Sequence, residues 1–201
     1  MKPTSPDGAL MRPPPLQVRL EAGVLTLTNT DAPWNRMSTE YMDALERAVQ
    51  DAATDPRVRV LVFTADGDEN FSVGMDLKQL ADRMTDRPAL ERLLDQRLRV
   101  LAMIESLEKP SIVTLYGYCL GGGLELPLAC HFRLAAETGA SIGLPELELG
   151  VVPAWGGTAR LTRCVGRDKA LDLMLRARKI DGPEALRIGL VHSVHPVGQL
   201  K

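Results

Sequence analysis

The sequence predicts an α/β fold in which strands and helices alternate along the chain and pack in layers. Three observations predict it: apolar residues alternate near the N-terminus, short β-branched runs recur later, and amphipathic helical stretches lie between them. The 201 residues can bury a sizeable core, and 45% hydrophobic with 25% charged residues is an ordinary globular composition. We therefore expect one folded domain at 16–201 behind a proline-rich flexible tail at 1–15.

The first predicted elements are a hairpin, a helix and a strand. Apolar residues alternate over 16–28 and are interrupted by Glu21-Ala22-Gly23, which is typical of a turn, so a β-hairpin is predicted. Ser38 is a suitable N-cap for a helix whose apolar positions recur every three or four residues until Asp55-Pro56. The run 58–64 is nearly continuous and β-branched, which indicates a buried strand.

The second half of the chain continues the alternation. A long amphipathic helix is predicted at 88–107 and a buried strand at 111–116. Further helices are predicted at 124–130, 168–178 and 183–188, and further strands at 132–135 and 190–194. Acidic residues are interleaved with the arginines of one stretch, so we expect a solvated helix face there rather than an anion site. These arginines are Arg83, Arg87, Arg92, Arg97 and Arg99.

Charge and cysteine content narrow the partners and the compartment. The net charge of −2 provides no broad positive field, which argues against a nucleic-acid partner. The three cysteines lack C-x-x-C spacing, so neither a disulfide framework nor a zinc site is predicted and a reducing compartment is favoured. The longest uncharged run, 110–124, is shorter than the roughly 20 residues of a membrane span. We expect a cytoplasmic protein with no membrane partner and no secretion signal.

Two segments are candidates for chemistry. Phe71-Ser72-Val73-Gly74-Met75-Asp76-Leu77 follows a strand and a turn, and residues 117–126 contain three successive glycines where a helix would begin. From spacing alone, a loop that needs positive φ angles explains these glycines about as well as a ligand approaching the bare backbone. Glu125 and Glu146 are the nearby carboxylates, and two converging carboxylates can divide the work of general base and general acid.

These segments, in their order along the chain, resemble the crotonase superfamily, also called the enoyl-CoA hydratase/isomerase family, from about residue 16 to the end. The resemblance is carried by Asn35-Arg36-Met37-Ser38, Asp55-Pro56-Arg57-Val58-Arg59-Val60, the 71–77 segment, Lys109-Pro110, the glycine run ending in Glu125, Pro145-Glu146, Gly150, Pro153, Gly156-Gly157-Thr158-Ala159-Arg160-Leu161 and Glu184-Ala185-Leu186-Arg187-Ile188-Gly189-Leu190-Val191.

The resemblance implies a crotonase-like core, a spiral of (ββα)-type units. Family members generally carry a helical region after the position of Val194, and because the sequence ends at Lys201 we expect the core without that full C-terminal region. By resemblance, the backbone N–H groups of Met75 and Gly122 form an oxyanion hole for an acyl-CoA thioester. The same resemblance implies Glu125 and Glu146 as catalytic residues, and Gly74, Asp76, Gly121 and Trp155 as substrate-binding residues.

The implied activity is hydration of a 2-enoyl-CoA thioester to 3-hydroxyacyl-CoA, or the reverse dehydration. Glu125 would position and deprotonate the water, and Glu146 would supply the proton to C2. The resemblance implies no metal and no redox cofactor, and coenzyme A enters only as part of the substrate. It also implies a homo-oligomer, which would be a trimer or a hexamer. Other crotonase-type reactions (isomerase, decarboxylase, thioesterase) and a non-catalytic acyl-CoA-binding module stay open as alternatives.

Three residues depart from the family pattern. Pro127 follows the glycine run where the family usually has alanine, which favours the non-catalytic alternative. His131 stands where the family usually has aspartate, and we interpret it as a structural residue rather than a base. Trp155 is bulky beside the implied acyl pocket, and we expect it to shorten that pocket.

A serine hydrolase is the alternative from a different enzyme class. Gly139-Ala140-Ser141-Ile142-Gly143 matches the G-x-S-x-G pattern, and downstream of it come, in suitable order, Asp168, Asp181, His192 and His195. A nucleophile elbow must lie between a strand and a helix, yet Pro145 follows closely and no helical period begins there. This alternative is therefore the least supported.

Overall fold

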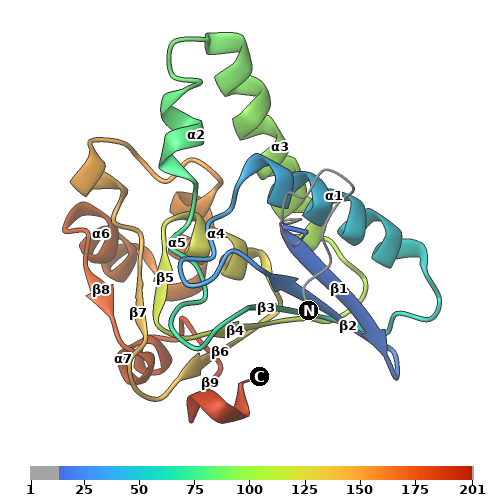
Figure 1. Cartoon of the computed structure of the whole chain (residues 1–201). Coiled ribbons are helices and arrows are strands. Elements are labelled where there is room, and N and C mark those ends of the chain that lie inside the picture. Colours follow the sequence, from blue (N-terminus) through green and yellow to red (C-terminus); the bar gives the residue numbers. More distant parts are fainter. Residues whose placement is uncertain (1–13, 201) are drawn as a thin grey trace.

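The computed structural model describes residues 14–200 and contains two β-sheets surrounded by helices (Figure 1). The predicted tail at 1–15 lies almost entirely outside the described residues. The larger sheet has six strands in the order β1-β2-β3-β4-β6-β9, and the smaller has three in the order β5-β7-β8. The strands are β1 (Leu16–Glu21), β2 (Val24–Asn29), β3 (Val60–Ala65), β4 (Ser111–Leu115), β5 (Tyr118–Leu120), β6 (Phe132–Ala136), β7 (Ser141–Gly143), β8 (Lys179–Ile180) and β9 (Ser193–His195).

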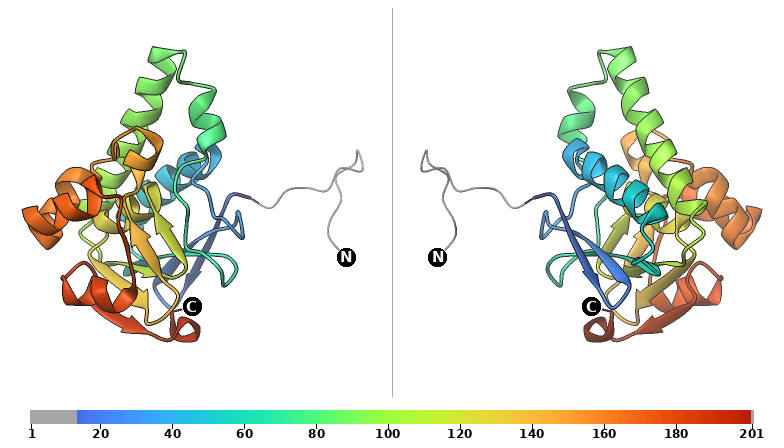
Figure 2. Two further views of the ribbon diagram at one scale, coloured as in Figure 1. Left: turned by 90° about the vertical axis from the view of Figure 1, so that its left-hand side faces the viewer. Right: turned by 90° about the vertical axis from the view of Figure 1, so that its right-hand side faces the viewer.

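The helices connect and cover the two sheets. They are α1 (Thr39–Thr54), α2 (Leu77–Ala81), α3 (Arg87–Glu105), α4 (Gly122–Ala129), α5 (Gly157–Val165), α6 (Arg167–Leu175) and α7 (Gly182–Arg187), with short 3₁₀ helices η1 (Glu146–Leu149) and η2 (Val197–Gln199). Helix α1 packs on α3, α3 on α4, α4 on α5 and α5 on α6. Figures 1 and 2 show α2 and the first part of α3 standing together away from the sheets.

Local signals account for the first elements. Strands β1 and β2 pair antiparallel across a turn in which Ala22 and Gly23 both have positive φ, as a two-residue hairpin with right-handed twist requires. The Ser38 side chain accepts a hydrogen bond from the N–H of Tyr41 and caps α1, which ends at Asp55. The predicted hairpin and first helix are confirmed, and β2, β3, β4, β6 and β9 pair in parallel as an alternating fold requires.

Two predicted boundaries are wrong for identifiable reasons. The helix predicted at 168–178 ends at Leu175, because Ala177 adopts a left-handed conformation with φ 48° and the chain turns back there. The last strand is Ser193–His195 rather than 190–194. The N–H groups of Leu190 and Val191 bond to the carbonyl of Ala185 at the end of α7, so these buried apolar residues finish a helix instead of pairing in the sheet.

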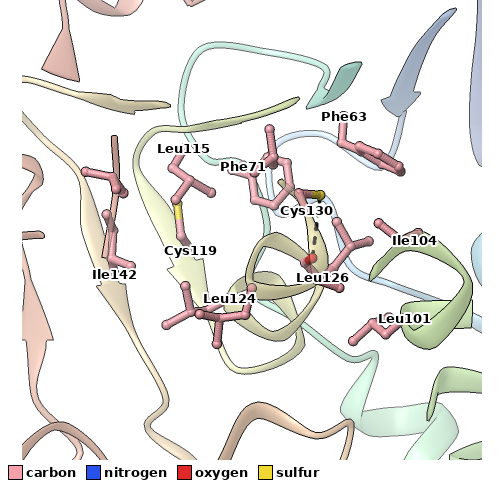
Figure 3. Packing of buried hydrophobic residues seen from close by; sticks show 14 of the residues in the cluster. Phe63, Phe71, Leu101, Ile104, Leu115, Cys119, Leu124, Leu126, Cys130 and Ile142 are labelled. Carbon is pink, nitrogen blue, oxygen red and sulfur yellow. Dashed lines mark hydrogen bonds between the residues drawn. The ribbon is translucent and has the colours of Figure 1, made fainter. Parts of the chain in front are cut away.

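Helix α4 lies at the centre of the molecule. All its residues are buried, and a helix that is apolar on every side belongs in an interior. Figure 3 shows Leu124 and Leu126 of α4 packed among side chains from both sheets and from α3, including Phe63, Cys119 and Ile104. Because α4 continues through Pro127 to Ala129, the glycine turn at its start is held by a fully packed helix.

None of the helices within residues 14–200 combines the length and the apolar composition that a membrane span requires.

Candidate active site

The two glycine-bearing segments meet at one edge of the sheet. They follow β3 and β4, which are parallel neighbours, so their carboxyl ends lie side by side. Ser72 forms an isolated parallel bridge with Cys119. The N–H of Ser72 donates to the carbonyl of Tyr118 over 2.9 Å, and the N–H of Leu120 donates to the carbonyl of Ser72 over 3.0 Å. The two segments are therefore hydrogen-bonded in register.

Glycine is required where these segments touch. A Cβ on Gly74, whose φ is +88°, would lie 2.6 Å from the carbonyl oxygen of Leu120 and 3.0 Å from the nitrogen of Gly122. A Cβ on Gly123 would lie 2.4 Å from the carbonyl oxygen of Ser72. Close backbone contact therefore explains these two glycines, and it brings Gly74 next to the first residue of α4.

The contact between Gly74 and Gly122 brings the segment that carries Met75 to the start of α4. Gly122 is the first residue of α4, where a helix leaves N–H groups without intrahelical acceptors and carries partial positive charge. Met75 follows Gly74, whose carbonyl accepts a hydrogen bond from the N–H of Met37 over 2.8 Å. Both Met75 and Gly122 line the same cavity.

This cavity has a volume of about 810 Å³ and an uneven lining. One part is formed by the glycine turn and carboxyl groups, and the rest is mainly apolar. All the predicted site residues except Gly74 line it: Met75, Asp76, Gly121, Gly122, Glu125, Glu146 and Trp155. Gly74 instead packs against the backbone of the glycine turn. The apolar side chains come mainly from two regions, α2–α3 (Leu77, Leu80, Met84, Leu90, Leu94) and the segment after η1 (Val151, Val152, Ala154).

Glu125 is buried and oriented by the start of α5. It is 2% exposed, and its Oε1 accepts hydrogen bonds from the N–H groups of Trp155 and Gly157, each over 2.8 Å. Burial is the main cause that raises the pKa of Glu125 to about 7, and the charge of Glu146 adds to it. The two N–H donors and Arg160 act in the opposite direction. The carboxyl group is therefore balanced between its two protonation states near neutral pH.

Glu146 is the second carboxyl group, and it is partly buried. It begins η1, and its Oε2 has no hydrogen-bond partner among the described residues. Burial raises the pKa of Glu146 above its ordinary value. A Cβ on Gly121 would lie 3.2 Å from Glu146 Oε1, so the carboxyl group rests against the glycine turn. Glu125 and Glu146 thus line one cavity, and the charge of Glu146 acts on Glu125.

Glu125→Gln is expected to stabilise the fold above pH 7 but not at pH 4.5. Because the Glu125 pKa is raised from 4.5 to about 7, the folded state binds this proton more tightly than the unfolded state does. The free energy of unfolding therefore keeps this contribution below pH 4.5 and loses it as the pH rises through 7. The loss is about 3 kcal/mol, and a neutral glutamine avoids it while Oε1 still accepts both N–H bonds. Urea unfolding at pH 4.5 and pH 8 measures the difference, with the exposed Glu148→Gln as control. An equal pH dependence in wild type and Glu125→Gln contradicts this prediction.

Comparison with known proteins assigns the chain to a family. Residues 19–201 match the family model for enoyl-CoA hydratase/isomerase. The chain belongs to the enoyl-CoA hydratase/isomerase family. The predicted family and the crotonase-type fold are confirmed.

Relatives of this family member include a curated sequence and solved structures. A probable enoyl-CoA hydratase from Bacillus subtilis is 38% identical over 176 residues, which are 88% of this chain and 67% of the relative. An enoyl-CoA hydratase structure from Geobacillus kaustophilus has a TM-score of 0.89 at 32% identity, covering 94% of this chain and 71% of that one. DspI from Pseudomonas aeruginosa has a TM-score of 0.88 at 31% identity, covering 92% and 75%.

Ser141 does not form a nucleophile elbow in this enoyl-CoA hydratase/isomerase family member. It begins β7, and its N–H donates to the carbonyl of Gly117. The next element after β7 is η1 rather than an α-helix, so the strand-turn-helix geometry of the hydrolase alternative is absent at this position. His131 bonds through Nδ1 to the backbone N–H of Ser111 over 3.1 Å, as expected of a structural residue.

Arg160 supports the site but is not among the predicted site residues. It is 9% exposed, its Nη1 donates to the carbonyl of Trp155 over 2.8 Å, and its Nε donates to Glu105 over 2.9 Å. It thereby holds the segment whose N–H groups bind Glu125. The Gly-Gly-Thr-Ala-Arg-Leu match contains this arginine, but no sequence signal indicates where its guanidinium lies.

The predicted solvated face of α3 is wrong at Arg97. This side chain is 1% exposed, whereas the side chains of its neighbours Arg87 and Arg99 are mostly exposed. Position 97 lies one turn from both Leu93 and Leu101, which are buried, so helical spacing places it on the inner stripe. This four-residue spacing is a sequence signal for the burial of Arg97, but the alternation of acidic and basic residues around it favours the opposite interpretation.

Proposed function

We propose that this protein catalyses syn addition of water to a 2-enoyl-CoA thioester, or the reverse dehydration. One observation carries the proposal: the buried carboxyl group of Glu125 and the partly buried one of Glu146 line the same cavity as Met75 and as Gly122, the first residue of α4. Acid/base groups beside backbone donors are what addition to a conjugated thioester needs.

The proposed oxyanion hole consists of the N–H groups of Met75 and Gly122. When water adds to C3, negative charge moves to the thioester oxygen, and N–H donors at that oxygen stabilise the enolate. Such preorganised donors commonly contribute about 3 kcal/mol each to the transition state. The start of α4 favours negative charge there, and the contact between Gly74 and Gly122 supports a fixed relation between the two donors.

The two glutamates receive different roles in this proposal. Two N–H donors hold Glu125 Oε1, which leaves its other oxygen to bind water and accept a proton as the water oxygen adds to C3. Glu146 Oε2 lacks a hydrogen-bond partner in the described chain, which suits a carboxyl that carries a proton and delivers it to C2. Before the step Glu146 holds a proton, and after it Glu125 holds one. The enzyme returns to its starting state when that proton passes from Glu125 to Glu146.

The cavity also suits the carrier part of the substrate. Lys78 is an exposed cation among its lining residues and offers positive charge to the phosphates of coenzyme A, whereas Arg36 in the same lining is paired with Asp31 over 2.7 Å. The proposal requires no resident metal or redox cofactor, since the thioester accepts the electrons. Dialysis against EDTA is therefore expected to leave the hydration rate unchanged, and a large loss of rate would contradict this part of the proposal.

The experiment that tests the proposal is incubation of the purified protein with crotonyl-CoA. Loss of enoyl absorbance together with a product heavier by one water, detected by mass spectrometry, supports hydration. Conversion of 3-enoyl to 2-enoyl thioester without hydration would replace the proposal by isomerase activity, and release of free coenzyme A thiol would replace it by thioesterase activity. Binding of crotonyl-CoA with no turnover would support the non-catalytic module instead.

A further inference from the structure

Trp155 is contacted through both its backbone and its ring. It is 3% exposed and lines the cavity beside Glu125. Its backbone N–H donates a hydrogen bond to Glu125 Oε1, and its backbone carbonyl accepts one from Arg160 Nη1, each over 2.8 Å. A Cβ on Gly122 would lie 2.4 Å from Trp155 Cζ3, so the indole ring packs directly against the first residue of α4. The ring therefore occupies space next to the proposed reaction centre.

Arg97 lies against the same ring. Its guanidinium carbon is 5.9 Å from the centroid of the Trp155 ring, within cation–π range. Its Nη1 donates to Gln96 Oε1 over 2.7 Å, whereas Nε and Nη2 have no hydrogen-bond partner within residues 14–200. Burial lowers the pKa of Arg97 to about 10, so the group stays charged at neutral pH.

Within residues 14–200, no ion pair neutralises the charge of Arg97. Asp43 and Glu40 of the α1 region stabilise it only at a distance, and Arg83 opposes it. A buried guanidinium with two unpaired nitrogens is costly. The cation–π contact, which is stronger when the cation is desolvated, is its main compensating interaction on the cavity side. The cation–π contact between Arg97 and Trp155 therefore restrains the indole ring.

We propose that Arg97 is a positioning residue that holds Trp155 as a wall of the acyl cavity, and that this wall restricts the site to short acyl chains. The inference rests on the proposed acyl-thioester function and adds a substrate class to it. An indole ring fixed beside Gly122 and Glu125 fills volume that the carbons beyond C4 of a longer acyl chain would occupy. Since one methylene in an apolar pocket changes specificity by about 10–200-fold, a wall at this position has a measurable effect.

The test compares acyl chain lengths in four variants. The ratio of kcat/KM for 2-decenoyl-CoA to that for crotonyl-CoA is measured for wild type, Trp155→Ala, Arg97→Met and Arg99→Met. We expect wild type to favour crotonyl-CoA, Trp155→Ala to raise the ratio at least about tenfold and Arg97→Met to raise it about threefold. Arg99, two positions along α3, has a largely exposed side chain that pairs with Glu46, so Arg99→Met is the matched control and should leave the ratio unchanged.

Specific outcomes overturn each part. A wild-type preference for decenoyl-CoA, or an unchanged ratio in Trp155→Ala, overturns the wall. A shift in Trp155→Ala without one in Arg97→Met overturns the role of Arg97. Calorimetric binding of saturated butyryl-CoA and decanoyl-CoA gives the same comparison without turnover. If wild type binds these thioesters with the expected length preference but hydrates none, the proposed function fails and the wall stands.

Fluorescence tests the positioning of the ring directly. The chain has two tryptophans, so Trp34→Phe leaves Trp155 as the sole indole emitter. In that background, Arg97→Met is expected to increase the acrylamide quenching constant of Trp155 about twofold, because the ring gains freedom on the face that Arg97 covers. Arg99→Met should not change it. Unchanged quenching in folded Arg97→Met protein overturns the positioning role, and a merely structural loss of stability would not produce the increase.

Discussion

Glutamine in place of Glu125 or Glu146 is expected to lower kcat for crotonyl-CoA hydration by about 10²–10⁴-fold. Each substitution keeps the size of the side chain and removes its ability to exchange a proton. In Glu125→Gln the side-chain oxygen can still accept hydrogen bonds from the backbone N–H groups of Trp155 and Gly157, so the fold of this segment is preserved. The KM for crotonyl-CoA should change little, because neither carboxyl group is proposed to bind the carrier.

The double variant distinguishes a cooperating pair from two independent residues. If both glutamates serve one proton transfer sequence, the double variant should lose little more activity than either single variant. Glu148→Gln is the control, since Glu148 lies in the same η1 turn but pairs with Lys179 at the surface. Retention of more than about a tenth of the wild-type kcat in either single variant contradicts the acid/base assignment.

Gly74→Ala is expected to lower kcat/KM by about 100-fold or more, comparable to removing an oxyanion-hole donor. The new Cβ would meet the carbonyl oxygen of Leu120 at 2.6 Å and the nitrogen of Gly122 at 3.0 Å, both backbone atoms. The chain can relieve this only by separating the segment that carries Met75 from the start of α4. The two proposed N–H donors would then no longer converge on one oxygen.

A matched glycine separates this clash from backbone strain. Gly166 has φ +85°, close to the +88° of Gly74, but a Cβ there meets nothing within 4 Å. With ψ 158°, Gly166 lies in a backbone region that is almost exclusive to glycine, so Gly166→Ala is expected to cost about 1–3 kcal/mol of strain and to leave kcat/KM unchanged. Urea unfolding and crotonyl-CoA kinetics of both variants provide the measurement. Equal kinetic losses in the two variants would show that strain, rather than the contact with Gly122, explains the effect.

Several parts of the fold follow from local sequence signals. The hairpin depends on Ala22-Gly23, and α1 depends on the Ser38 cap and on Asp55, all of which act within a few residues. Helices α2 and α5 and the strands of the smaller sheet were not among the predicted elements. All of them are short, and the strands take their backbone partners from segments distant in the sequence. Helical spacing from Leu93 and Leu101 places Arg97 on the inner stripe of α3, but the extent of its burial depends on what packs against that helix.

By itself the sequence determined the α/β class, the order of most elements and the family, because capping residues, hydrophobic periodicity and ordered motifs are local properties of the chain. It also indicated Met75, Gly122, Glu125 and Glu146 as candidates, whose roles stay predictions. Only the tertiary structure decided that these residues share one cavity and that the Glu125 pKa lies near 7. The physical reason is that burial and electrostatic coupling arise from neighbours on other segments, which the folded chain alone brings within reach.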